Sequence, residues 1–316
     1  MAKQHGRMQT TLAGRVWLSG IGVHSGTPAS ITLLPAAPDT GICFVRTDLK
    51  GGGERFVPAD TRCVSATDHC TTLAQGDATV ATVEHLMAAL SALEVDNVLV
   101  EVDGPEVPIL DGSAAPFVDA IDRVGVATFP TPRRYIKVLK SVRAECGRSF
   151  GELSPFDGRR IEVEIDFANC VVGRQKFSAA VSAESFRRDL CRARTFGFLA
   201  DVEKLWAHGL ARGASLENSI VVADDRVLNS EGLRYRDEFV RHKALDAMGD
   251  LALAGAPILG SFRSYRGGHG LNRRVLEALF ADSSAWAFVE MPIRQRVPLG
   301  RQPVAMDAAA FGPDVS

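Results

Sequence analysis

Apolar and polar residues alternate in several stretches of the first half of the chain, notably 15–18, 30–34 and 97–102. A period of two places alternate side chains on one face of an extended chain, so these stretches predict β-strands. Residues 82–93 differ, because they are rich in Ala, Leu and Met, which have the highest helix propensities. We predict a helix there and a second one over 115–123.

The second half repeats this order of strands and helices. Residues 129–134 contain two prolines, which interrupt regular structure, and we expect this segment to link two domains, 1–130 and 131–316. Strands followed by helices in each half predict an α+β fold. The elements expected in the second half are strands at 135–139, 151–153, 160–167 and 219–222, and helices at 183–190, 237–253 and 272–280.

Composition restricts the classes of function. Of the 316 residues, 46% are hydrophobic and 23% are charged, and a net charge of −2 provides no basic surface for nucleic acid. The polar N-terminus has no apolar signal segment, and no apolar run reaches the length of about 18 residues that spans a membrane. The six cysteines form no CxxC pair. We expect a cytoplasmic monomer with no nucleic-acid partner and no membrane span.

The sharpest polar pattern lies in the predicted helix at 237–253. His242, Asp246 and Asp250 are spaced four apart, which places them on one face of a helix. An imidazole and a carboxylate one turn apart can bind one cation, and Asp250 could accept the free imidazole N–H. Spacing alone is weak evidence, however, and a surface helix with a favourable His–Asp pair explains the same pattern.

A second pair, Glu84 and His85, lies near the start of the helix predicted at 82–93. A catalytic zinc usually has three protein ligands and one open position, so His85 could complete a set with His242 and Asp246. Neighbouring residues of a helix point about 100° apart, which lets Glu84 border the same cleft as a base without binding the metal. An exposed helix turn is the alternative explanation.

Two histidines are flanked by glycines. His269 lies in the segment 264–272 and His24 in 20–26, and glycine-rich backbone can approach a ligand closely. His269 could act as a general acid or hold a phosphate as the imidazolium. The spacing around His24 is not that of a phosphate-binding P-loop. A glycine-rich loop before a helix that starts near Asn272 is the alternative for the first segment.

Seven motifs follow one another along nearly the whole chain. They are GIGVHSG (20–26), TVEHLMAALSAL (82–93), ILDGSAAPF (109–117), RTFGF (194–198), SLENSIVV (215–222), LNSEGLRYRDEFVRHKALDAMGDL (228–251) and GGHGLN (267–272). In this order they resemble the bacterial UDP-3-O-acyl-N-acetylglucosamine deacetylases. Two segments depart from the family pattern: residues 168–172, where relatives often carry His-Pro, and the tail after Met291, which is longer than the shared core.

The resemblance implies hydrolysis of the N-acetyl group of UDP-3-O-(3-hydroxyacyl)-N-acetylglucosamine to acetate and a 2-amino sugar nucleotide, the committed step of lipid A biosynthesis. It implies a Zn²⁺ ion, with Fe²⁺ as the alternative metal in the cell. The implied metal ligands are His85, His242 and Asp246. The implied catalytic residues are Glu84 as general base, Thr195 as hydrogen-bond donor to the oxyanion, His269 as imidazolium and general acid, and Asp250, which would orient His269 or raise its pKa.

Two further features are implied by the substrate. Its diphosphate requires cations, for which Lys243 and His24 are the candidates, and its acyl chain requires an apolar passage, which the family builds from an insertion, here at about 197–222. Phe196 and Cys63 would border the site by analogy. The implied fold has two α+β domains, each a helix pair packed on a β-sheet with a small insertion, and the active site lies between them.

Two other functions compete with this one. Two histidines and a carboxylate also form the facial triad of non-haem iron(II) oxygenases, although those ligands usually come from barrel strands rather than from a helix. Glu84 would also have no role in oxygen activation. A sugar-nucleotide-binding protein without turnover is the second alternative, and substitution of Glu84 would distinguish it from an enzyme.

Overall fold

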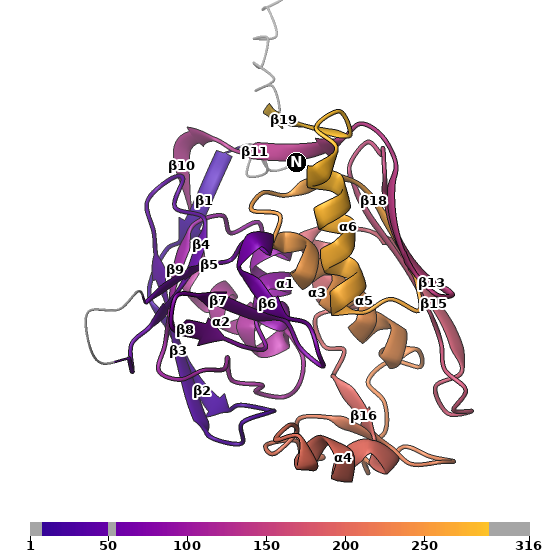
Figure 1. Ribbon diagram of the computed structural model, residues 1–316. Helices are drawn as coiled ribbons and strands as arrows, with labels where there is room; N and C mark the ends of the chain where they lie inside the picture. The colour runs from indigo at the N-terminus through magenta and orange to yellow at the C-terminus, as the bar shows by residue number, and fades with distance from the viewer. Residues whose placement is uncertain (1–7, 50–54, 291–316) are drawn as a thin grey trace, which may run out of the picture.

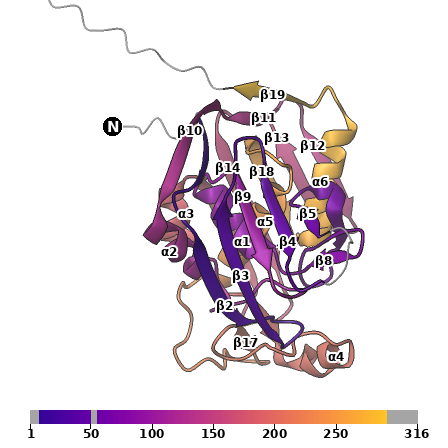
Figure 2. The same ribbon diagram turned by 90° about the vertical axis from the view of Figure 1, so that its left-hand side faces the viewer.

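The computed structural model describes residues 8–49 and 55–290, and the tail after Met291 lies outside these ranges. Two α/β sandwiches face each other through their helices, with one β-sheet on each outer side (Figures 1 and 2). The α+β prediction is therefore confirmed. Within the described ranges, no helix combines the length and the apolar character needed to cross a membrane.

The first sandwich contains a five-stranded sheet in the order β2–β3–β9–β4–β5, with helices α1 and α2 on its inner side (Figure 2). The alternation of buried and half-buried residues along β9 agrees with the predicted period of two. Three short strands, β6 to β8, form a separate antiparallel sheet. The bounds are β2 (Val16–Ile21), β3 (Pro28–Pro35), β4 (Ile42–Arg46), β5 (Phe56–Pro58), η2 (Thr61–Cys63), β6 (Val64–Ala66), β7 (Thr72–Gln75), β8 (Ala78–Val80), α1 (Glu84–Ala92), β9 (Val98–Val102) and α2 (Ala115–Val124).

The second sandwich contains a seven-stranded mixed sheet, against which α5 and α6 pack. Its central strand β18 pairs antiparallel with β13 and parallel with both β11 and β14. The insertion forms a parallel pair, β16 and β17, with α4 between them in sequence. The bounds are β11 (Arg134–Val138), β12 (Val142–Cys146), β13 (Ser149–Ser154), β14 (Arg159–Asp166), β15 (Arg174–Ala180), α3 (Ala183–Asp189), β16 (Phe196–Phe198), η3 (Leu199–Asp201), α4 (Val202–Ala207), β17 (Ile220–Val222), α5 (Glu238–Ala252), β18 (Ile258–Tyr265), α6 (His269–Ala281) and β19 (Trp286–Glu290).

The expectation that prolines interrupt regular structure at 129–134 is wrong. Strand β10 (Val126–Pro132) includes both prolines and pairs antiparallel with β1 (Met8–Leu12) in a two-stranded sheet. The register shifts between Met8 and Thr10, opposite the prolines, and Met8 then pairs with Pro132. A proline lacks the N–H that a regular ladder needs, but an edge strand with a bulge accommodates it.

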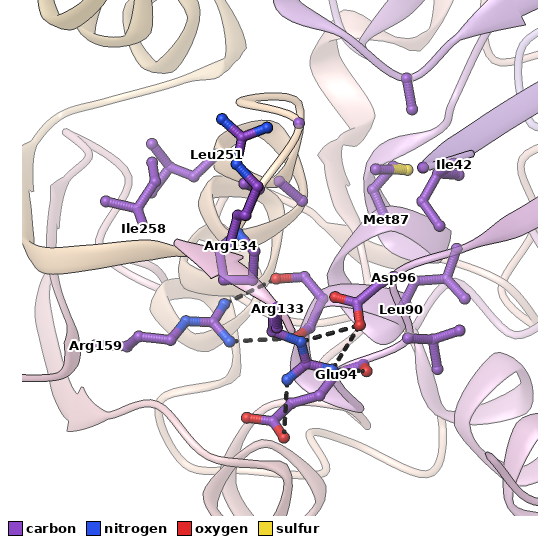
Figure 3. Close-up of a pocket in the computed structure, with 18 of the residues that line it drawn as sticks. Ile42, Met87, Leu90, Glu94, Asp96, Arg133, Arg134, Arg159, Leu251 and Ile258 are labelled. Carbon is purple, nitrogen blue, oxygen red and sulfur yellow. Dashed lines mark hydrogen bonds and ion pairs between the residues drawn. The ribbon is translucent and has the colours of Figure 1, made fainter. Parts of the chain in front are cut away.

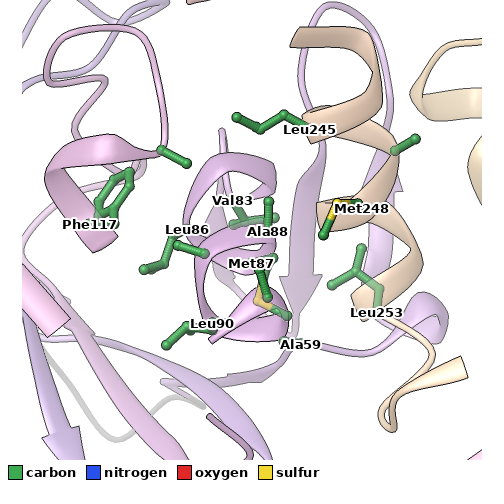
Figure 4. Close-up of a cluster of buried hydrophobic side chains, with 14 of the residues drawn as sticks. Ala59, Val83, Leu86, Met87, Ala88, Leu90, Phe117, Leu245, Met248 and Leu253 are labelled. Atoms are coloured by element: carbon green, nitrogen blue, oxygen red, sulfur yellow. The ribbon is translucent and has the colours of Figure 1, made fainter. Parts of the chain in front are cut away.

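The two sandwiches meet where α1 packs against α5. Figure 4 shows the apolar side chains of this contact, with Leu86 and Met87 on α1 and Leu245 and Met248 on α5. A Cβ atom added to Gly249 would lie 2.0 Å from the carbonyl oxygen of Glu84. Glycine at this position in α5 therefore lets the first turn of α1 approach closely enough to place residues of both helices in one site.

A cavity of about 700 Å³ separates the sandwiches at the C-terminal ends of α1 and α5 (Figure 3). Its lining includes apolar side chains such as Leu90 and Leu251 and the buried Arg133, and it contains none of the predicted metal ligands. The predicted metal ligands His85 and His242 lie towards the other, N-terminal end of the same helix pair.

Candidate metal centre and active site

Three predicted ligands from two helices come together in the interior. His85 on α1 and His242 and Asp246 on α5 are 4%, 2% and 3% exposed, and their ligand atoms all lie within 4.8 Å of one another. The Asp246 Oδ1 atom is 3.5 Å from Nε2 of His85 and 3.3 Å from Nε2 of His242. Atoms that bind one tetrahedral zinc at about 2.0–2.1 Å are separated by about 3.3 Å, so the spacing fits a shared ion.

The chemical state of these side chains also fits a cation. The Nδ1 atom of His242 lies 3.0 Å from the carbonyl oxygen of Ala193, which places its proton there and leaves Nε2 with a lone pair. Burial lowers the pKa of His242 to about 3, so the ring is neutral. Among the described residues, the buried Oδ1 of Asp246 accepts no hydrogen bond. A buried carboxylate oxygen without a hydrogen bond, close to the Nε2 atoms of two imidazoles, is an arrangement that a metal ion stabilises.

Glu84 is the first residue of α1 and lies beside the cluster without joining it. Its side chain is 3% exposed, and Oε2 accepts a hydrogen bond of 3.1 Å from the backbone N–H of Thr71. Burial raises the pKa of Glu84, while the nearby His269 and His85 lower it. A carboxylate with a raised pKa accepts a proton more readily, which suits a general base.

Asp250 pairs with His269. Its Oδ2 atom lies 2.9 Å from Nδ1 of His269 and accepts a hydrogen bond of 2.8 Å from Asn272 Nδ2. The expectation that Asp250 could accept the N–H of His242 is wrong, because Ala193 takes that N–H. Burial alone would lower the pKa of His269, but the Asp250 carboxylate outweighs it and raises the pKa to about 9.

The expected position of His269 in a loop also needs correction. His269 is the first residue of α6, so the helix begins three residues before the predicted start at Asn272. The chain turns at Arg266, with φ of +50°, and Gly268 is extended before the helix begins. The ring is therefore fixed by a helix terminus and by Asp250, and only 8% of the residue is exposed.

The segment 193–196 connects the cluster to the insertion. Ala193 bonds to His242, and two residues later the half-buried Thr195 is held by backbone bonds to Gly112 and Ile220. The Phe196 ring packs 6.4 Å from the His242 ring, centroid to centroid. Two neighbouring groups, the buried Arg194 guanidinium and the Glu238 carboxylate, are 3.0 Å apart and fix this segment to the start of α5.

Lys243 lies beside the cluster, but its ammonium group is already paired. Its Nζ donates a hydrogen bond of 2.7 Å to Asp246 Oδ2, and 23% of its side chain is exposed. His24 is half-buried in the loop between β2 and β3. Burial lowers its pKa, the Glu106 carboxylate opposes this, and the charges of His69 and His269 add to the lowering. Cys63 ends η2 beside Gln75, at 3.7 Å, and η2 packs against α6.

Two residues of this region were missed by the reasoning from sequence. Thr71 donates its hydroxyl to Asp250 Oδ1 at 2.6 Å as well as its N–H to Glu84, so it bridges two of the predicted catalytic residues. Glu106 holds the loop that carries His24. Neither residue has a local sequence pattern that could have indicated these contacts, because their partners are distant in the chain.

The site thus brings together the side chains needed for hydrolysis: a place for a metal ion, a buried carboxylate beside it, and an imidazolium opposite. This combination suits attack of water on an amide carbonyl followed by protonation of the leaving amine.

Comparison with known proteins agrees with this chemistry. The family model described as UDP-3-O-acyl N-acetylglycosamine deacetylase matches residues 9–281. Proteins named UDP-3-O-acyl-N-acetylglucosamine deacetylase from Brucella ovis, Brucella canis and Brucella melitensis biotype 2 are each 56% identical to the chain over 283 residues. The alignments cover 89% of this chain and 98% of each relative. The chain therefore belongs to the UDP-3-O-acyl N-acetylglycosamine deacetylase family.

Proposed function

We propose that the chain removes the N-acetyl group of UDP-3-O-(3-hydroxyacyl)-N-acetylglucosamine, which yields acetate and the free 2-amino sugar nucleotide for lipid A biosynthesis. The observation that carries the proposal is the buried His85–His242–Asp246 cluster with its unsatisfied carboxylate oxygen, in a chain of this deacetylase family. The enzyme is a metal-dependent hydrolase, and zinc is its metal. Iron(II) as the metal loaded in the cell stays a prediction.

In this proposal, the chain's own residues divide the proton transfers. A bound Zn²⁺ would lower the pKa of a water molecule towards about 7 and polarise the acetamide carbonyl. Glu84 takes the proton from the attacking water, which is supported by its burial beside the cluster and its raised pKa. His269, protonated through its contact with Asp250, stabilises the oxyanion and donates a proton to the leaving amine. The Thr195 hydroxyl donates a hydrogen bond to the same oxyanion.

Substrate recognition extends from the cluster to the insertion at about 197–222. The insertion exposes large apolar side chains that a folded core would normally bury, with Leu199 50%, Trp206 56% and Leu216 47% exposed. We assign this surface, with Phe196 at its inner end, to the acyl chain. His24 and Lys243 bind the diphosphate, and the Lys243 ammonium group then exchanges its bond with Asp246 for a phosphate oxygen. Cys63 borders the site on the α6 side.

The organisation of the chain supports two domains with a boundary near residue 130. Strand β10 still pairs with β1 of the first half, and β11 opens the second sheet at Arg134. Helices α1 and α5 pack on each other within the chain, so their facing sides are not available for a contact between copies. We therefore propose a monomer without a nucleic-acid partner, which light scattering after size-exclusion chromatography tests.

Acetate release from the acylated UDP-sugar is the test of the function. It is measured with purified protein as isolated, after treatment with a chelator, and after zinc is restored. We expect activity that disappears with chelation and returns with zinc. Folded protein that releases no acetate under any metal condition would contradict the proposal and direct attention to oxygen consumption or to binding without turnover.

A further inference from the structure

Glu106 is a buried carboxylate outside the predicted catalytic set. It follows strand β9 and is 2% exposed, and none of the described Lys or Arg side chains forms an ion pair with it. Its charge is instead met by four neutral donors. Oε1 accepts hydrogen bonds from the N–H of His24 and the hydroxyl of Thr82, each 2.9 Å long. Oε2 accepts from the N–H of Ser25 at 2.9 Å and from its hydroxyl at 2.7 Å.

These donors belong to two segments that are far apart in the chain. His24 and Ser25 lie in the loop between β2 and β3, whereas Thr82 lies two residues before Glu84, the first residue of α1. Thr82 adopts φ of +58°, a conformation unusual for a β-branched residue, and its bond to Glu106 compensates for that strain. One carboxylate therefore fixes the position of the His24 loop relative to the start of the catalytic helix.

The contact between Glu106 and the loop explains why residue 22 is a glycine. A Cβ atom at Gly22 would lie 2.1 Å from Glu106 Oε2 and 2.2 Å from Ser25 Oγ. Only a residue without a side chain lets Glu106 reach the loop backbone.

The insertion of the second sandwich is attached to the same loop. Arg212 donates its N–H to the carbonyl oxygen of His24 at 3.2 Å, and Gly213 donates to that of Val23 at 3.0 Å. A Cβ atom at Gly213 would lie 2.3 Å from the carbonyl oxygen of Gly22, so the two backbones are in direct contact. The contacts thus run without a gap from Glu106 through the loop to the segment assigned to the acyl chain.

We propose that Glu106 is a positioning residue for substrate recognition, which holds the His24 loop and, through it, the insertion in register with the first turn of α1. The inference rests on the proposed function and adds to it a residue that touches neither the metal ligands nor the reacting atoms. Because Glu106 acts on the groups that bind the diphosphate and the acyl chain, its loss changes KM rather than kcat.

The test is Glu106→Gln, which preserves shape but turns an NH₂ group towards donors on one side. We expect KM for the acylated UDP-sugar to rise about ten-fold or more, with kcat within about three-fold of wild type and unchanged zinc content. Asp103→Asn is the matched control, since the exposed Asp103 accepts the N–H and hydroxyl of Ser30 in the same manner but holds a different strand. This variant should keep the wild-type KM.

The effect of Glu106→Gln on KM is also measured with and without the His24 side chain, which separates a positioning role of Glu106 from a general loss of stability. In a His24→Ala background, Glu106→Gln should raise KM by a clearly smaller factor than in the wild type, because one of the two groups that Glu106 positions is gone, while the backbone contacts of the loop with the insertion remain. If Glu106→Gln does not fold, as judged by thermal unfolding, Ser25→Ala removes only one donor and should raise KM about three-fold. A wild-type KM in the folded variant, or a loss confined to kcat, overturns the inference. Wild-type protein without acetate release would instead overturn the proposed function.

Discussion

At the scale of single residues, the proposed mechanism makes Glu84 a base and not a ligand. Replacing Glu84 by Gln keeps the shape of the side chain but removes its ability to take a proton. We expect kcat to fall about 100- to 10,000-fold, with zinc content and KM close to wild type. Acetate release together with metal analysis measures this. Glu101→Gln on strand β9 is the control, and loss of zinc from the Glu84 variant would mean that Glu84 belongs to the metal site instead.

The pairing of Asp250 with His269 predicts a dependence on pH. The carboxylate raises the pKa of His269 to about 9, so the imidazolium persists through neutral pH and is lost as pH rises through that value. The kcat/KM of the wild type should therefore fall on the basic side near pH 9. In Asp250→Asn the pKa of His269 returns towards about 6.5 or below, and the basic limb moves to lower pH.

Asp282→Asn provides the control for this shift, because Asp282 lies at the other end of α6 and is bonded to Ser284. Its pH profile should match that of the wild type. A basic limb at the same pH in Asp250→Asn would show that another group supplies the proton to the amine.

The residue scale also shows where prediction from sequence succeeds. His242 and Asp246 lie one turn apart on a helix, so local periodicity alone places them together, and the ordered motifs added His85. Helix spacing left two candidate partners for Asp250, His242 and His269. Spacing alone could not decide between them, because the choice depends on α6 starting at His269 and on Ala193 accepting the N–H of His242. Contacts between segments distant in the chain carry no local periodicity.

At the scale of secondary-structure elements, the site depends on how closely α1 and α5 approach. Alanine in place of glycine normally stabilises a helix interior by about 1 kcal/mol. At Gly249 the new Cβ would lie 2.0 Å from the Glu84 carbonyl oxygen, so the helices must separate. We expect Gly249→Ala to destabilise the protein by about 1–3 kcal/mol and to lower kcat, because Glu84 and His85 move with α1.

Urea unfolding and acetate release test this prediction. Gly104→Ala is the matched control, since a Cβ atom at Gly104 meets nothing within 4 Å. Equal stability of the two variants would mean that α1 adjusts without cost.

The accuracy of the predicted elements follows from the strength of their local signals. The helix expected at 237–253 agrees closely with α5, because the periodicity of its buried residues is a local signal. The helix expected from residue 82 begins at Glu84 instead, since Thr82 is in the left-handed region. Strand β18 was not predicted, because a central strand paired on both sides lacks clean alternation, and its partners come from distant parts of the chain.

At the scale of the whole molecule, one buried arginine fixes the segment that connects the two sandwiches. Arg133 lies between β10 and β11 and is 1% exposed. It donates to Asp96 Oδ2 from Nε at 2.9 Å and from Nη2 at 2.7 Å, and to the carbonyl oxygen of Glu94 at 2.6 Å (Figure 3). The chain that leaves the first sandwich is thereby fixed to the turn after α1, close to the cavity between the sandwiches.

Removal of this arginine should leave the Asp96 carboxylate, whose side chain is 15% exposed, with its hydrogen bonds from Thr10 but without a charged partner. We expect Arg133→Met to lower the free energy of unfolding by about 3–5 kcal/mol at neutral pH.

Burial already raises the pKa of Asp96 against the opposing effect of Arg133, and without the arginine the pKa rises further. A carboxyl whose pKa is higher in the folded state binds more protons there, so stability is lost as pH rises through that pKa and regained towards acid. The deficit of Arg133→Met should therefore shrink between pH 7 and pH 5 in urea unfolding, and Asp96→Asn should remove this pH dependence in the double variant. Arg134→Met, at the neighbouring exposed arginine that stacks on Phe288, should show neither effect. A deficit that does not change with pH would mean that lost packing around Arg133, rather than the stranded charge of Asp96, accounts for the instability.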